Sequence, residues 1–261
     1  MSDSDIGDKT DNTMTAFFKL CGIKENKLKE TLADLIEKKN PAIELDFHEG
    51  EASLRISSEA EGELSAKKIL KQCVKEVKNR LGEMIYSTDE NETLEGVVVN
   101  LLKESDYTLT TAESCTGGMF AARIINVAGA SDVLKEGFIT YSNKAKRKYL
   151  GVKKRSLDKF TAVSEQVAKE MAKGVCDNTE ADCSIAITGL AGPDGGSDKH
   201  PIGQVFIGCT VNKNTVVKEY KFAGDRQAIR MYAVTEALAL LRLCLLQNFS
   251  EITFGEGKKK K

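Results

Sequence analysis

The sequence predicts an α/β fold, a mixed β-sheet covered by helices, preceded by a smaller α+β domain. Two observations lead to this prediction. After residue 90, short apolar or β-branched runs alternate with amphipathic helical segments, which is the pattern of a sheet covered by helices. Residues 14–86 instead contain two adjacent strands with strict alternation, flanked by helices, and a polar run at 87–92 follows them.

The composition is that of an ordinary globular protein and argues against several partners. Of 261 residues, 41% are hydrophobic and 30% charged, and the net charge is −1. No overall field therefore draws the chain to nucleic acid or to a membrane surface. The apolar run at 238–246 is short and is interrupted by Arg242, so no segment is long enough to span a bilayer. We expect neither nucleic acid nor membrane as a partner.

Cysteine and histidine usage bears on the compartment and on metal binding. The seven cysteines are odd in number and lack a C-x-x-C spacing, which does not suggest a disulfide framework. We infer a reducing, cytoplasmic environment. The two histidines, His48 and His200, are far apart in the sequence, so we expect no metal site and no cofactor.

The first domain is predicted over residues 14–86, after a disordered tail at 1–13. Its expected elements are a strand at 14–22, a helix at 25–39, strands at 42–47 and 52–57 joined by a hairpin at 48–51, and a helix at 64–81. No catalytic group is evident in it, and its charges are mixed in sign. It has no G-x-x-G loop, with which KH domains clamp RNA.

The second domain is predicted over residues 90–247, followed by a basic tail at 248–261. Its expected strands are 107–111, 137–141, 183–188, 204–211 and 216–222, the last two joined by a hairpin. Its expected helices are 93–104, one beginning at 119, 142–150, 164–176 and 224–247. Asn91 or Thr93, Ser142 and Ser164 are the expected N-caps of three of these helices.

The turn at 112–118 is the strongest candidate for a functional site. It joins a strand to a helix, where small hydroxyls and free backbone N–H groups suit a phosphate or a developing oxyanion; a simple capping turn is the alternative. It is neither a Walker A loop nor a G-x-S-x-G elbow, because no GK[ST] follows and Glu113 precedes Ser114. Cys115 is a rival nucleophile, but Ser114 is preferred because a thiol usually needs a histidine base.

Two further loops follow strands and could close over this turn. In the first, Tyr141 with Lys144 or Lys146 could form a base system without histidine, provided that the lysine is neutral; two solvated lysines are the alternative. The second, at 188–196, is rich in glycine, which lets backbone N–H groups approach an anion; a flexible surface loop is the alternative. Asp194 in this loop has no partner carboxylate for a metal.

Together these segments resemble the C-terminal domain of the CinA family, also called the nicotinamide mononucleotide (NMN) deamidase or PncC family. The matching residues are Ala112–Gly118, Thr140–Asn143, Ala145–Lys146, Ala162–Ser164, Thr188–Gly189, Ala191–Gly196, Pro201, Gly203 and Gly224–Arg226. Residues 14–86 look like the KH-like module that precedes this domain in full-length CinA. The pyrophosphatase activity of the further CinA domain is not carried over, because no segment resembles that domain.

The resemblance implies a three-layer fold and an amidohydrolase that converts NMN to nicotinic acid mononucleotide and ammonia. It implies Ser114 as nucleophile and Lys146, helped by Tyr141, as base. Lys144 differs from the family pattern, which often has a non-basic residue there, and it is a second candidate lysine. It also implies backbone N–H groups at 116–118 as oxyanion donors, and the glycine loop with Arg226 as the binder of phosphate and ribose. The expected substrate-binding residues are Glu113, Thr116, Gly117, Gly118, Asn143, Thr188, Gly189, Gly192 and Arg226.

The family also implies a homodimer or higher homo-oligomer, a state that the apolar helix at 224–247 suits. The alternative function is a catalytically inactive protein that binds a nucleotide or a partner.

Overall fold

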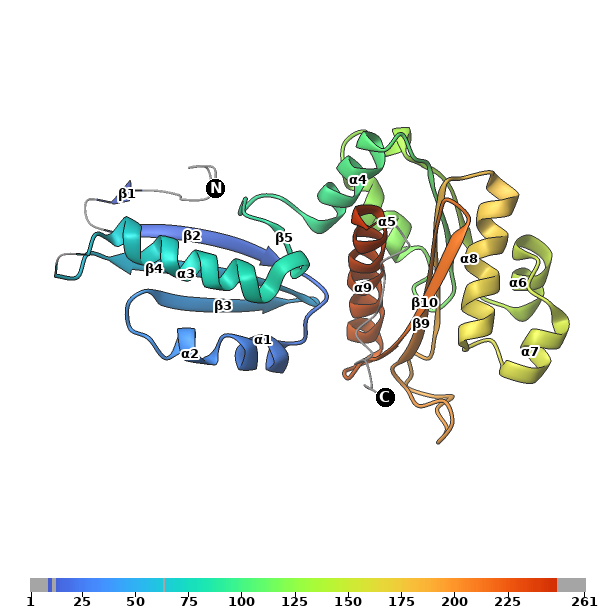
Figure 1. Ribbon diagram of the computed structural model, residues 1–261. Coiled ribbons are helices and arrows are strands. Elements are labelled where there is room, and N and C mark those ends of the chain that lie inside the picture. The colour runs from blue at the N-terminus through green and yellow to red at the C-terminus, as the bar shows by residue number, and fades with distance from the viewer. Residues whose placement is uncertain (1–8, 11–12, 63, 248–261) are drawn as a thin grey trace, which may run out of the picture. The chain divides into compact units, whose positions relative to one another are not determined.

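The computed structural model describes residues 9–10, 13–62 and 64–247, and the chain divides into two compact units between Val97 and Val98 (Figure 1). Helix α4 (Leu94–Glu104) crosses this division. The polar run at 87–92 lies just before α4. The expected fold class, an α/β domain with a mixed sheet preceded by a small α+β domain, is confirmed.

The first unit is an antiparallel sheet packed against helices. Its strands are β1 (Lys9–Thr10), β2 (Thr13–Leu20), β3 (Ala42–His48), β4 (Glu51–Glu59) and β5 (Ile85–Ser87), in the order β1-β2-β4-β3, with β5 also paired to β2. Its helices are α1 (Glu25–Thr31), α2 (Ala33–Ile36), α3 (Ala66–Leu81) and the short 3₁₀ helix η2 (Gly82–Met84). Alternate residues of β2 and β4 are buried in one core with α1, α2 and α3, as the two-residue period of a half-buried strand requires.

The second unit has three layers, with a mixed sheet between α5 and α9 on one face and α6, α7 and α8 on the other (Figure 1). Its strands are β6 (Leu109–Glu113), β7 (Leu134–Ile139), β8 (Cys183–Gly189), β9 (Gln204–Val211) and β10 (Asn214–Lys221), in the order β10-β9-β8-β6-β7. Its helices after α4 are α5 (Met119–Ile125), η3 (Ala130–Asp132), α6 (Asn143–Leu150), α7 (Lys154–Phe160), α8 (Glu165–Thr179) and α9 (Arg226–Leu246).

The direction of three strands places the functional loops at one edge of this sheet. Strand β6 is parallel to both β7 and β8, whereas β9 and β10 are antiparallel to their neighbours. The carboxyl ends of β6, β7 and β8 therefore lie together. The chain leaves β6 toward α5 on one face and β7 toward α6 on the other, which is where open α/β sheets bind ligands.

Most predicted elements are confirmed, and the differences have local causes. The expected caps Thr93, Ser142 and Ser164 each accept a backbone N–H of their helix. The helix expected at 25–39 is instead α1 and α2 and ends at Ile36, because only polar residues follow and leave no apolar face to bury. Helix α7 was missed, because Leu157 is its one buried apolar residue and the helical pattern is correspondingly weak.

Strand boundaries and the N-terminal tail also differ from expectation. Strand β6 runs to Glu113, two residues beyond the predicted end, and β7 ends at Ile139, two residues before it. A disordered tail over 1–13 is wrong for Lys9–Thr10 and Thr13, which lie in β1 and β2, because the edge of β2 offers backbone partners that composition cannot reveal. The rest of that tail and the basic tail at 248–261 fall outside the described residues.

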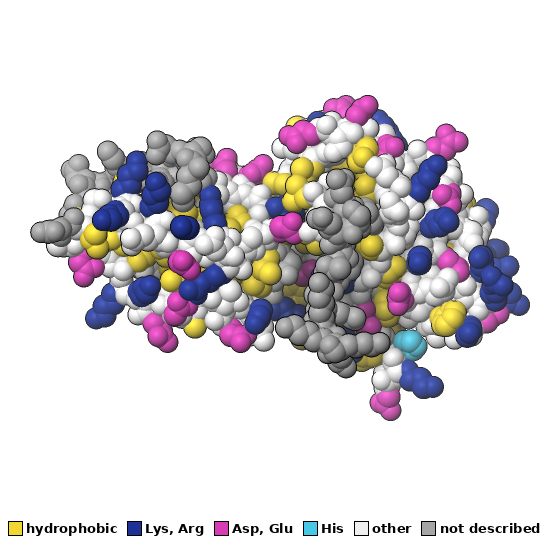
Figure 2. Space-filling model, viewed as in Figure 1, with side chains coloured by type: hydrophobic (Ala, Val, Ile, Leu, Met, Phe, Trp, Pro, Cys, Tyr) yellow, Lys and Arg dark blue, Asp and Glu magenta, His cyan; other side chains and the backbone are white. Residues whose placement is uncertain are grey.

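Charged side chains of both signs are interspersed over much of the visible face, as Figure 2 shows. This agrees with the net charge of −1. The mixture leaves the pocket and its local groups, rather than a global field, as the source of any ligand selectivity.

A close approach of α6 and α8 generates a stability prediction. A Cβ atom added at Gly174 of α8 would lie 1.8 Å from the carbonyl oxygen of Leu150. Gly174→Ala gains about 1 kcal/mol of helix propensity. The overlap with a backbone atom forces the helices apart at a cost of about 1–3 kcal/mol or more. We expect calorimetry to show a lower melting temperature for Gly174→Ala and little change for the exposed neighbour Lys173→Ala. A melting temperature at or above that of the wild type would contradict this packing.

Candidate active site

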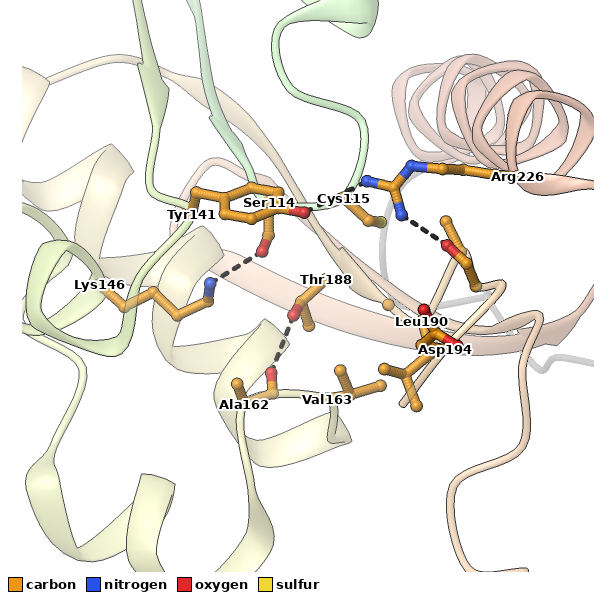
Figure 3. Close-up of a pocket in the computed structure, with 13 residues that line it drawn as sticks. Ser114, Cys115, Tyr141, Lys146, Ala162, Val163, Thr188, Leu190, Asp194 and Arg226 are labelled. Carbon is orange, nitrogen blue, oxygen red and sulfur yellow. Dashed lines mark hydrogen bonds between the residues drawn. The ribbon is translucent and has the colours of Figure 1, made fainter. Parts of the chain in front are cut away.

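Ser114 is fixed at the carboxyl end of the central strand β6. Its backbone N–H donates to the carbonyl of Ile187 at 2.9 Å, and the N–H of Thr140 donates to the carbonyl of Glu113 at 2.8 Å. The β-ladder thus continues on both sides of the turn. The Ser114 side chain is buried to 8% exposure and faces a pocket (Figure 3).

Lys146 reaches Ser114 from the first turns of α6. Its Nζ lies 2.9 Å from Oγ of Ser114 and donates to the carbonyl oxygen of Thr140 at 2.7 Å (Figure 3). The side chain is 1% exposed, and no ion pair to it is found among the described residues. Burial without a counter-charge disfavours the ammonium ion and lowers the pKa of Lys146 to about 8. A fraction of Lys146 is therefore neutral near pH 7 and can accept the Ser114 proton.

The geometry distinguishes between the alternatives that the sequence left open. Burial raises the pKa of the Cys115 thiol to about 11, so this thiol stays protonated at neutral pH. Lys146 contacts the hydroxyl of Ser114, and its neighbour Lys144 is exposed and does not line the pocket. Ser114 and Lys146 are therefore the hydroxyl and the amine that lie in hydrogen-bond contact in the pocket.

The pocket beside Ser114 has a volume of about 250 Å³ and is built from the predicted loops. Its lining residues are Ser114, Cys115, Tyr141, Lys146, Ala162, Val163, Thr188, Gly189, Leu190, Ala191, Gly192, Asp194 and Arg226. Thr188 donates its hydroxyl to the carbonyl of Ala162 at 2.8 Å and so ties two walls together. A Cβ at Gly189 would lie 2.6 Å from Val205, so glycine lets this wall pack closely on β9.

Arg226, the first residue of α9, closes the side of the pocket opposite Lys146 (Figure 3). Its guanidinium donates to the carbonyl of Gly192 at 2.7 Å and to the hydroxyl of Tyr141 at 3.2 Å. We expected the Tyr141 hydroxyl to assist Lys146, but in the structure this hydroxyl contacts Arg226 instead. Tyr141 is 65% exposed, so its ring is available to pack against a ligand.

The Glu113 carboxylate is hydrogen-bonded to backbone N–H groups of the protein itself. Its two oxygens accept the N–H groups of Gly118, Phe120 and Ala121 at 3.0–3.2 Å, and its side chain is 1% exposed. These donors are the orphan groups at the start of α5, which a carboxylate satisfies well. The Glu113 carboxylate and the Gly118 N–H thus already have hydrogen-bond partners, which does not favour substrate binding by Glu113 or oxyanion donation by Gly118.

Three other expected binding residues lie outside the pocket lining. Asn143 is exposed at the start of α6, so direct substrate contact by its side chain is not supported. Thr116 and Gly117 follow Cys115 in the turn, and within the described ranges no acceptor contacts their backbone N–H groups. Thr116 is fully buried, and its hydroxyl has no partner among those same residues.

The sequence reasoning missed Arg230. Its Nε donates to the carbonyl of Cys115 at 2.9 Å and its Nη2 to the carbonyl of Thr116 at 3.0 Å. The available signal was its spacing, because a residue four positions after Arg226 lies on the same face of a helix. Ala162 and Val163 were matched to the family pattern, but the apolar wall that they form with Leu190 was not predicted.

Both units match one protein family. Residues 91–245 match the family described as the CinA C-terminal domain, and residues 15–87 match the damage-inducible protein CinA KH domain. The chain belongs to the CinA family.

Individual relatives agree with this membership. A CinA-like protein of Kosmotoga olearia is 46% identical over 86% of this chain and 55% of its own length. The chain thus spans about half the length of the curated relatives it matches. The competence/damage inducible protein CihA of Agrobacterium tumefaciens has a similar solved structure, with 38% identity, a TM-score of 0.57, and coverage of 59% of this chain and 94% of that one. The solved structure of the competence damage-inducible protein A of Klebsiella pneumoniae is also similar, with 38% identity and a TM-score of 0.58. The match covers 59% of this chain and 96% of that one.

Two features are absent from the described residues. None of the helices in that part of the chain is both long and apolar enough to cross a membrane. Within the same residues, no group of three or more His, Cys, Asp or Glu side chains is arranged to hold a metal ion.

The capping role of Glu113 can be tested without an activity assay. Glu113→Gln keeps the size but removes the charge and one acceptor oxygen, so at least one buried N–H loses its partner at a cost of about 1–3 kcal/mol. We expect hydrogen exchange at residues 118–121 to become faster. Glu136→Gln, on exposed β7, is the matched control and should leave this exchange unchanged. Equal protection in both variants would exclude the cap.

Proposed function

We propose that the second unit is an amidohydrolase that converts NMN and water to nicotinic acid mononucleotide and ammonia. The observation that carries the proposal is the buried Lys146 amine, 2.9 Å from the Ser114 hydroxyl and with its pKa lowered to about 8. A neutral amine beside a serine is a base for nucleophilic catalysis that needs no histidine. The substrate is taken from the resemblance to NMN deamidases.

In the first step, Ser114 Oγ attacks the carboxamide carbon and Lys146 Nζ accepts the hydroxyl proton. The negative charge that develops on the amide oxygen needs N–H donors, and those of Thr116 and Gly117 are the ones in the turn without an acceptor among the described residues. Lys146 then donates its proton to the leaving nitrogen. The C–N bond breaks, ammonia departs, and an ester joins Ser114 to the nicotinoyl group.

In the second step, water attacks this ester. Lys146, neutral again, accepts a proton from the water and returns it to Ser114 Oγ as the ester C–O bond breaks. The products are the free serine and the carboxylate of nicotinic acid mononucleotide. Because the carbonyl of Thr140 holds Nζ at 2.7 Å, the amine stays beside Ser114 throughout both steps.

The opposite side of the pocket suits the rest of the nucleotide. Arg226 is the one cationic group besides Lys146 in the described lining, and its fork of N–H donors fits a phosphate. The exposed ring of Tyr141 can pack on the pyridine, and Asp194 can accept ribose hydroxyls. The alternative is a catalytically inactive CinA protein that binds a nucleotide without turning it over.

The nucleophile is tested by ammonia release from NMN. Ser114→Ala removes the attacking oxygen, so we expect the rate to fall at least about 10³-fold. Cys115→Ala should stay within about tenfold of the wild type, because burial keeps its thiol protonated at neutral pH. Release that survives in Ser114→Ala and is lost in Cys115→Ala would reverse the assignment. NMN that binds the wild type without ammonia release would favour the inactive alternative.

The base predicts a pH dependence. Below pH 8, most of Lys146 is protonated, and only the shrinking neutral fraction can accept the Ser114 proton. We therefore expect kcat/KM to rise about tenfold per unit at acidic pH and to level off above about pH 8. Lys144→Gln is the matched control and should keep this profile, whereas Lys146→Gln should lose the activity. A flat profile between pH 6 and 9 would exclude Lys146 as the base.

A further inference from the structure

Arg230 connects α9 to the turn that carries the nucleophile. It lies one helical turn after Arg226, which faces the pocket. The Arg230 guanidinium binds two consecutive carbonyls, with Nε at 2.9 Å from Cys115 O and Nη2 at 3.0 Å from Thr116 O. A planar fork that holds two successive carbonyl groups fixes the planes of both peptides as well as their position.

The orientation of these two peptides determines where their N–H groups point. Both peptide bonds are trans, so each N–H is directed opposite to the C=O of the same peptide group. The carbonyls of Cys115 and Thr116 face Arg230. The N–H groups of Thr116 and Gly117 belong to these same two peptides, so both point away from the guanidinium.

The other donors of the turn are already used. Glu113 takes the N–H groups of Gly118, Phe120 and Ala121, and the N–H of Met119 donates to the carbonyl of Thr116. Over the described residues, this leaves Thr116 and Gly117 as neighbouring N–H groups without an acceptor. Gly117 has φ = +62°, and consecutive N–H groups around such a residue converge on one point and suit an anion.

We propose that Arg230 is a positioning residue for catalysis. By holding the carbonyls of Cys115 and Thr116, it aims the N–H groups of Thr116 and Gly117 at the oxyanion that forms when Ser114 attacks. This inference rests on the proposed function in one respect, namely that Ser114 is the nucleophile. Arg230 does not line the pocket, and its hydrogen bonds go to the backbone of the turn, so its loss should affect the transition state more than the binding of the ground state.

The test compares two arginines that link α9 to its surroundings. Arg230→Met removes both carbonyl contacts, and we expect kcat for ammonia release to fall about 10- to 100-fold with KM changed less than about twofold. Arg230→Lys keeps a donor but not the fork, so its kcat should lie between those of Arg230→Met and the wild type. Arg123→Met is the matched control, because Arg123 donates to the Thr235 hydroxyl of α9 at 2.8 Å, whereas Arg230 donates to carbonyls of the turn.

A second readout is independent of NMN. A fluorophosphonate reacts with an activated serine: the Ser114 Oγ–P bond forms, the P–F bond breaks, fluoride leaves, and Lys146 accepts the serine proton. Its phosphoryl oxygen occupies the position of the oxyanion. We expect mass spectrometry to show fast labelling of Ser114 in the wild type and Arg123→Met, slower labelling in Arg230→Met, and none in Ser114→Ala.

The two readouts separate the failure of this inference from failure of the proposed substrate. Labelling without ammonia release would reject NMN as substrate and leave Arg230 to be judged on labelling rates alone. Arg230→Met that is labelled as fast as the wild type, or that changes only KM, would overturn the positioning role. A loss matched by Arg123→Met, or accompanied by an equal fall in melting temperature in both variants, would show that Arg230 acts on stability alone. A wild type that is neither active nor labelled would overturn both proposals.

Discussion

The chemistry of the site depends on one lysine side chain that is buried away from water beside a serine. A fall in the pKa of Lys146 from 10.5 to about 8 corresponds to roughly 3 kcal/mol against charging the amine. A carboxylate nearby would remove this effect, because an ion pair favours the ammonium form. Glu113 is the carboxylate next to Ser114 in the sequence, and its oxygens are committed to the start of α5. The fold thus hydrogen-bonds this carboxylate to backbone N–H groups, and the amine remains basic enough to act and neutral enough to accept a proton.

Two side chains of opposite charge hold the backbone of the turn after Ser114, one through N–H groups and the other through carbonyl groups. Glu113 binds N–H groups that follow the turn, and Arg230 binds carbonyls within it. Neither side chain needs to reach the pocket to matter, since each fixes the backbone that presents the serine. Glycine at 117 permits the positive φ that this path requires, at a point where a Cβ would come within 3.6 Å of Arg230.

The sequence predicted those parts of the site that depend on nearby residues. The order of strands and loops, the caps Ser142 and Ser164, and the glycine-rich wall at 188–196 follow from local patterns, and the structure has them. The directions in which the side chains point, and hence their long-range contacts, were harder to predict. Tyr141 and Arg226 are 85 residues apart and Arg230 and Cys115 are 115 apart, so no spacing in the sequence could pair them. Glu113 and Asn143 were predicted to bind the ligand because they belong to motifs near the site. A sequence motif does not indicate which of its side chains point away from the pocket.

Helix α9 explains why the site also depends on packing far from it. It carries Arg226 and Arg230 on one face, so a single rigid element sets both the pocket wall and the nucleophile turn. Its following turns are apolar on almost all sides and are buried against the sheet, with Ala233, Ala237, Leu238 and Leu241 fully covered. A small shift of this helix on β8 and β9 would move both arginines together. Because close-packed cores resist such sliding, the hydrophobic length of α9 gives the two guanidinium groups a fixed separation from Ser114.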